Sequence, residues 1–334
     1  MNQTLLGILF FVVIAEIAMM TPTDIGEKKA AADQEPISST AASTYDQQVQ
    51  QRMQGVHVVE SKSESKEWEL WADHAIGFKT EGDLALSQVK ANFFANDGIS
   101  FLVTGDTGQV ETATKNMVIS GQVVTTSSNG YVFHTDTVKY NSHDRVLSSS
   151  TKVEVSGPKD SLGGHMFIKG NSMLAELNKG VVTISQEVEA KKRVRKNEDM
   201  IIHSDQAQVY GKGHEVRFLG QVKINMHGMQ INGPDALFHY KNGTDIPDSV
   251  QLTGGVKVQD VNKWATSQRL NINLAKNEFV FDGQPRVVQD NDEVRGDQIV
   301  FLDGGKKVRV RNAKVSVSQD TINQKGKNYE STHD

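Results

Sequence analysis

Apolar side chains at every second position are the feature that most restricts how this chain can fold. Across residues 56–318, Val, Thr, Ile and Phe alternate with polar residues, and Asn, Gly and Asp turns bound each run. A period of two is typical of half-buried β-strands, and no stretch of this region keeps a helical period for three turns. Proline, which cannot donate to a sheet ladder, occurs there at only four positions, Pro158, Pro234, Pro247 and Pro285. The body is therefore predicted to be all-β.

A weak internal repeat runs through this body. A polar residue followed by apolar side chains two and four positions later recurs at intervals of 29 to 35 residues. A period in this range is typical of stacked repeats, and we expect about eight units, each a kinked hairpin of strands roughly ten residues long. The marking residues are Asp73, Asp106, Asp136, Asn171, Asp205, Asp235, Gln268 and Asp297.

A second mark, apolar-x-apolar-x-Gly, lies inside each unit. Its copies end at Gly121, Gly157, Gly220, Gly254 and Gly283, and Gln186 occupies the glycine position of one further copy. An inward glycine lets the strand bend and leaves free volume in an apolar interior. The same pattern also fits a packed sandwich in which the glycines only form bends, and periodicity alone does not separate the two.

The N-terminal region has a different composition. Residues 5–20 form an apolar run interrupted only by Glu16, and at about 1.5 Å per residue the run spans roughly 24 Å of a ~30 Å hydrocarbon core. No small-residue cleavage site follows it, so we predict an uncleaved membrane anchor at 1–20; a cleaved signal peptide is the alternative. Residues 21–55, rich in Ala, Ser, Thr and Gln, are expected to be a flexible linker.

Composition excludes several functions. A net charge of −5 argues against nucleic acid as the main partner. The absence of cysteine removes thiol catalysis, disulfides and Cys-based zinc sites. None of the ten histidines has metal-ligand spacing, and residues 290–293 fit a polar turn better than a calcium loop. We therefore expect no catalytic residue, no metal and no cofactor.

Two groups of segments resemble members of a known transport system. Residues 71–75, 119–141 and 150–157 resemble LptC, the anchored periplasmic member of the lipopolysaccharide-transport system, whereas 203–224 and 294–317 resemble the OstA-like fold of LptA. The chain is thus similar to an LptC-like half (56–195) joined near 191–199 to an LptA-like half (196–318), with a polar tail at 319–334. The basic run 191–196 is predicted to be a solvated loop between the halves, with contact to lipid phosphates as the alternative.

The resemblance implies an open, twisted β-jelly-roll whose sheets enclose an apolar slot for acyl chains. It also implies an inner-membrane protein with one N-terminal span, a periplasmic body and no enzymatic activity. The implied partners are lipopolysaccharide, the inner-membrane ABC transporter of the export system and an LptA-like or outer-membrane LptD-like protein. We expect strands at 297–318 to pair with that protein through an open edge. The alternatives are a structural or adhesive β-solenoid with a solid core and a carbohydrate-active enzyme, which would need paired carboxylates.

Strand parity and repeat register select the residues predicted to line the slot and bind lipid. They are Val138, Tyr140, Phe218, Val222, Leu237, Leu270, Ile272, Phe279, Phe281, Ile299 and Phe301.

Overall fold

The computed structural model describes residues 49–62, 65–78, 82–159, 164–195, 198–211, 215–226, 228–240, 247–290 and 292–316. These residues all belong to one compact unit, Gln47–Asp334. The predicted anchor at 5–20 and the polar tail at 319–334 lie outside them. Among the described residues, no helix has the length and apolar character needed to cross a membrane.

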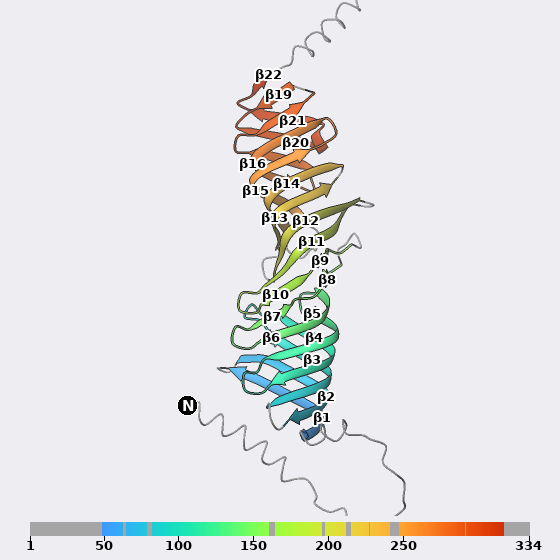
Figure 1. Cartoon of the computed structure of the whole chain (residues 1–334). Helices are drawn as coiled ribbons and strands as arrows, with labels where there is room; N and C mark the ends of the chain where they lie inside the picture. Colours follow the sequence, from blue (N-terminus) through green and yellow to red (C-terminus); the bar gives the residue numbers. More distant parts are fainter. Residues whose placement is uncertain are drawn as a thin grey trace, which may run out of the picture. The chain divides into compact units, whose positions relative to one another are not determined.

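The described chain folds into one continuous antiparallel sheet of 22 strands (Figure 1). The N-terminal half comprises β1 (Val49–Lys62), β2 (Ser65–Phe78), β3 (Asp83–Phe94), β4 (Ser100–Glu111), β5 (Met117–Ser127), β6 (Val132–Asn141), β7 (Val146–Ser149), β8 (Val153–Ser156), β9 (Phe167–Gly170), β10 (Ser172–Glu176) and β11 (Val181–Arg195). The C-terminal half comprises β12 (Glu198–Tyr210), β13 (Glu215–Met226), β14 (Met229–Tyr240), β15 (Pro247–Gln259), β16 (Lys263–Asn273), β17 (Glu278–Asp282), β18 (Arg286–Gln289), β19 (Asp292–Arg295), β20 (Gln298–Leu302), β21 (Lys307–Arg311) and β22 (Lys314–Ser316). The all-β prediction is confirmed.

Two boundaries differ from those expected from the sequence. β1 begins at Val49, so residues 49–55, which their polar composition assigned to the linker, lie in an edge strand. Residues 191–195 are part of β11 and pair with β12 from Ile201 to Glu198, so the basic run is not a loop over this range. Lys191 and Arg193 are exposed and alternate with Lys192 and Val194, which face inward, and the hairpin continues through them.

From β4 onward, the pairing of each long strand is interrupted near the middle of the strand by a shift of register. In β13 the pairing with β14 skips between Leu219 and Val222, and in β15 the pairing with β16 skips between Thr253 and Val256. Where the interruption is larger, the strand divides into two, as β7 and β8 or β17 and β18 do. A bulge of this kind bends a strand, so each hairpin contributes to both facing walls of the roll.

The polar residue and the glycine that mark the sequence repeat lie against each other at these bends. A Cβ placed on Gly121 would lie 2.6 Å from an oxygen of Asp106, and one on Gly220 would lie 2.2 Å from an oxygen of Asp205. Both glycines have positive φ, 86° and 73°, a conformation that glycine adopts without steric cost. The polar residue of one strand thus packs against the glycine bend of the next. Two marks differ: Gly157 follows β8 at a strand end, and Gly254 packs against Pro234 rather than Asp235.

Inward-facing apolar side chains from both walls form one continuous core. It includes Trp68 of β2, Phe133 of β6, Ile184 of β11, Phe238 of β14 and Ile299 of β20, each no more than 2% exposed. At the bends, serine hydroxyls bond the interrupted backbone: Ser204 donates to the carbonyl of Gln206 at 2.9 Å, and Ser267 to that of Arg269 at 2.7 Å. These bonds satisfy carbonyl groups that the bulges remove from the ladder.

Candidate functional site: the apolar interior and its mouth

The interior face of the rolled sheet contains most of the residues selected from the sequence. The nine buried ones, none more than 4% exposed, are Val138, Tyr140, Phe218, Val222, Leu270, Ile272, Phe279, Phe281 and Ile299. Phe301 is partly buried against the same core. The structure therefore gathers these side chains, from β6 to β20, along one apolar surface.

Leu237 is a correction to the sequence-derived set. It is half-buried and alternates with Ala236 and Phe238, both fully buried. The pairing of β14 with β15 skips between Asn232 and Asp235, and this bulge shifts the inward parity by one residue. The residue that packs against the glycine bend of β15 is Pro234, from which a Cβ placed on Gly254 would lie 2.7 Å away. The buried residues two and four places later are therefore Ala236 and Phe238, and spacing counted from Asp235 predicted the wrong face.

The role expected for the inward glycines is also corrected. Gly121, Gly220 and Gly283 adjoin the side chains of Asp106, Asp205 and Gln268 at the bends, so they do not leave free volume in the interior. Their positive φ is what a bend requires. The structure supports the alternative in which the glycines form bends.

The interior is closely packed. One mainly apolar cavity inside it has a volume of about 70 Å³ and is lined by Met229, Val258, Trp264, Phe279, Phe281 and Phe301, among others. A larger hollow of about 610 Å³ is lined by residues of the bends, among them the exposed Gln221, Pro234 and Gln268. Typical ligand pockets measure about 300–1,000 Å³. A long acyl chain would therefore enter this interior only if the two walls separated.

Two rows of strand ends border the interior. The first margin contains the β3–β4 turn (95–99) and the β5–β6 turn (128–131). The second margin contains the β4–β5 turn (112–116), the β6–β7 turn (142–145) and the β10–β11 turn (177–180). The ladder pairs place these rows at opposite ends of the strands. We call the line along which the two margins face each other the mouth.

The margins touch in the N-terminal half. The amide of Asn96, in the first margin, donates to the carbonyl of Leu177, in the second, at 3.0 Å. The Phe93 and Tyr140 rings, from β3 and β6, lie 4.6 Å apart between centroids. The mouth is therefore closed at this level.

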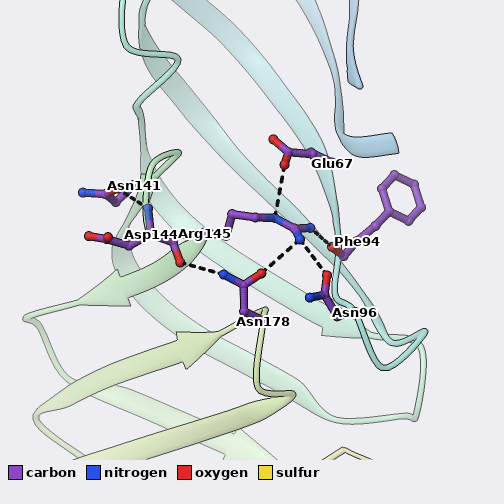
Figure 2. A network of polar contacts seen from close by, with 7 residues as sticks. All are labelled: Glu67, Phe94, Asn96, Asn141, Asp144, Arg145 and Asn178. Carbon is purple, nitrogen blue, oxygen red and sulfur yellow. Dashed lines mark hydrogen bonds and ion pairs between the residues drawn. The ribbon is translucent and has the colours of Figure 1, made fainter. Parts of the chain in front are cut away.

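Arg145 of the β6–β7 turn is the main polar contact across the mouth (Figure 2). Its Nη1 donates to the side-chain oxygens of Asn96 at 2.7 Å and Asn178 at 3.1 Å, and its Nη2 donates to the carbonyl of Phe94 at 2.6 Å. Its Nε lies 3.6 Å from an oxygen of Glu67, at the start of β2. The only sequence signal for this residue is an arginine in a turn, which does not reveal contacts with residues 49 and 33 positions away.

Tyr140 lies below this network. Burial, followed by the charge of the Glu67 carboxylate, raises the pKa of Tyr140 to about 12, although the Arg145 guanidinium acts in the opposite direction. The phenol therefore stays neutral, as an interior side chain should.

A second cavity of about 70 Å³ crosses the mouth near the junction of the halves. Its lining includes Tyr131, Met166, Lys192, Tyr210 and Tyr240. Lys192 is 1% exposed, which corrects the expectation of a solvated basic run. It is a charged side chain in a mainly apolar interior. Its hydrophobic stem packs readily in such surroundings.

The described part of the chain contains no cluster of three His, Asp or Glu side chains that could hold a metal ion.

The bent antiparallel sheet around an apolar interior defines a β-jelly-roll protein. Residues 25–193 match the family model for lipopolysaccharide-assembly, LptC-related proteins. Since this match covers half of the sequence, the chain belongs to the LptC-related family. Residues 201–303 match the model for the LptA/(LptD N-terminal domain) LPS transport protein. The chain is thus a periplasmic component of the lipopolysaccharide-transport bridge, whose families are non-catalytic.

One solved structure is also similar. It is the crystal structure of LptH, the LptA homologous periplasmic component of the lipopolysaccharide transport device from Pseudomonas aeruginosa. The identity is 14% and the TM-score 0.33, and the match covers 36% of this chain and 94% of that one. No curated protein matches the sequence.

Proposed function

We propose that this chain carries the acyl chains of lipopolysaccharide along its interior, from the inner membrane toward the outer membrane. The observation that supports this is the continuous apolar face from β2 to β20, which passes through both family-matched regions. Exposing an acyl chain of about 12 carbons to water costs on the order of 9 kcal/mol, at about 0.8 kcal/mol per CH₂. An apolar path lowers that barrier without a chemical reaction.

The remaining parts of the proposal concern placement and partners. Residues 5–20 would hold the chain in the inner membrane, and the ABC transporter of the export system would supply the energy. An LptA-like or LptD-like protein would receive the lipid through strand pairing at the C-terminal edge. The halves at 56–195 and 196–318 would form consecutive sections of one path.

Site-specific photo-crosslinking tests the path. A photo-reactive residue replacing Phe218, which is fully buried, should capture lipopolysaccharide in cells. The matched control replaces Arg217, which is adjacent and faces outward in an ion pair with Asp235, and should capture far less. Phe281 and Val280 provide a second pair in β17. Equal capture at both parities would overturn the proposal.

The small cavities favour a second candidate, a structural β-solenoid with a permanently solid core. In that case no interior position should capture lipid, even when export is active. Crosslinking at Phe218 therefore separates the two candidates.

A further inference from the structure

The contacts of Arg145 join three turns that come from opposite ends of the strands. Its guanidinium reaches Phe94 and Asn96 in the first margin and Asn178 in the second (Figure 2). Its own carbonyl accepts a hydrogen bond from the amide of Leu177 at 3.1 Å. Asn178 also donates to the carbonyl of Asp144 at 3.3 Å. One side chain thus ties both margins together.

The backbone at Arg145 indicates that the arginine side chain is what this position requires. Its φ is 54°, in the left-handed region, which is uncommon for residues other than glycine and asparagine. The corresponding last residues of two other turns, β10–β11 and β16–β17, are Gly180 and Asn277, with φ of 65° and 51°. Glycine or asparagine would adopt this backbone conformation at least as easily as arginine. What arginine adds at this position is its side-chain contacts across the mouth.

These contacts are suited to being broken and remade. Three of the four acceptor groups are neutral: two amide oxygens and one backbone carbonyl. The single carboxylate, Glu67, lies 3.6 Å from Nε, beyond hydrogen-bond length, and Nε is buried without a hydrogen-bond partner among the described residues. Asn96 and Asn178 are exposed, so water can replace the arginine at both. Opening therefore separates three hydrogen bonds to neutral acceptors and one long ion pair, Arg145–Glu67, whose side chains are 16% and 13% exposed.

We propose that Arg145, with Asn96 and Asn178, forms a latch that holds the mouth of the N-terminal half closed, and that acyl chains enter this half sideways when the latch opens. This inference rests on the proposed lipid path. It follows from the packed interior: a chain can reach Val138, which is 1% exposed, from the side only if the margins part. Asn96 and Leu177 are in backbone contact at the line where they must separate.

A reversible crosslink tests the latch. The chain has no cysteine, so Asn96→Cys with Asn178→Cys introduces a single pair. Both native side chains contact the same Nη1 atom, at 2.7 and 3.1 Å, and the amide of Asn96 donates to the carbonyl of Leu177, so the two positions are neighbours across the mouth. With a photo-reactive residue at Val138, oxidation should abolish lipopolysaccharide capture, and reduction should restore it.

The matched control is a disulfide that does not cross the mouth. Asn116 accepts a hydrogen bond from the amide of Ser142 at 3.0 Å, and both lie in the second margin. Asn116→Cys with Ser142→Cys should leave capture at Val138 unchanged in either redox state. Circular dichroism of both oxidised proteins checks that they remain folded.

A second variant opens the latch. Arg145→Ala removes the guanidinium, and in the intact chain it should raise the rate of capture at Val138 above that of the parent protein. Equal capture by the locked, reduced and Arg145→Ala proteins would overturn the latch, because lipid would then enter along the axis. Absence of capture in the parent protein would instead overturn the lipid path itself.

Discussion

Leu237 and Phe238 are neighbours in β14 that face opposite sides of the sheet. Phe238 is fully buried, and its ring lies 5.3 Å from that of Phe218. Phe238→Ala should therefore lower the free energy of unfolding by about 3–5 kcal/mol. Leu237→Ala, on the outer face, should cost about 1 kcal/mol. Urea unfolding with an unchanged m-value measures both, and similar losses would show that the inward register of β14 is different.

Tyr140 makes stability depend on alkaline pH. Its pKa is raised from 10.0 in the unfolded chain to about 12, so the folded state keeps its proton where the unfolded state has lost it. The stabilisation is fully present below pH 10, and it is lost as the pH rises through 12. Between these values the free energy of unfolding should fall more steeply for the parent protein than for Tyr140→Phe. Parallel pH profiles of the two proteins would contradict this assignment.

The bend is the structural element that repeats along the molecule. At Gly220 a methyl group would meet the Asp205 carboxylate, and φ is 73°. The left-handed conformation alone costs about 1–2 kcal/mol for a residue with a Cβ, so Gly220→Ala should destabilise the protein by more than that.

Two further comparisons separate the destabilising effect of the positive φ at Gly220 from that of the close contact with Asp205. In β14, Gly233 has a nearest neighbouring atom at 3.5 Å and no positive φ, so Gly233→Ala should cost less in the same thermal or urea unfolding assay. Combining Gly220→Ala with Asp205→Ala removes the close contact and should recover part of the loss. A double variant with strictly additive losses would mean that Asp205 does not oppose the alanine.

The C-terminal strands are the second element that carries a prediction. β21 pairs with β20 and β22 pairs with β19, and within the described residues no strand covers their other edges. Val308 and Val315 are 54% and 62% exposed. We expect one of these edges to pair with the next protein of the bridge, although the charges at Lys306, Lys307, Arg309, Arg311 and Lys314 can also discourage pairing.

Proline substitutions locate that edge. Successive residues of a strand direct their N–H groups to opposite edges, so Val308→Pro and Arg309→Pro remove donors on different sides of β21. One should abolish crosslinking to the partner while lipid capture at Phe218 persists. The other should weaken the pairing with β20. Retention of the partner contact in both variants would place the docking edge elsewhere, with Val310→Pro and β22 as the next candidates.

At the scale of the whole molecule, the N-terminal run determines attachment. If residues 5–20 are retained, protein purified from membranes should begin near Met1 and resist extraction by salt. A soluble form that begins near Thr21 or Asp24 would identify the run as a cleaved signal peptide. N-terminal sequencing of the membrane and soluble fractions distinguishes the two, and neither outcome changes the proposed lipid path.

The amino-acid sequence by itself determined the all-β class, the repeat and most of the interior face. Period-two alternation reports which side of a strand is apolar, and it placed Phe218, Leu270 and Phe281 correctly because these residues lie in regular stretches of strand. The order of the LptC-like and LptA-like segments was likewise readable from the sequence, since each motif is local.

Only the tertiary structure decided which way side chains face, and what they contact, where the strand pairing is interrupted. Pro234, not Asp235, packs against the glycine bend of β15, which places Leu237 on the outer face. The Asp205–Gly220 contact explained two marks that are far apart in the repeat. Arg145 meets Glu67 and Asn96 only after the sheet has rolled and brought opposite strand ends together. Such contacts depend on the combined bending of many hairpins. The alternation of apolar and polar residues within one strand gives no information about that combined bending.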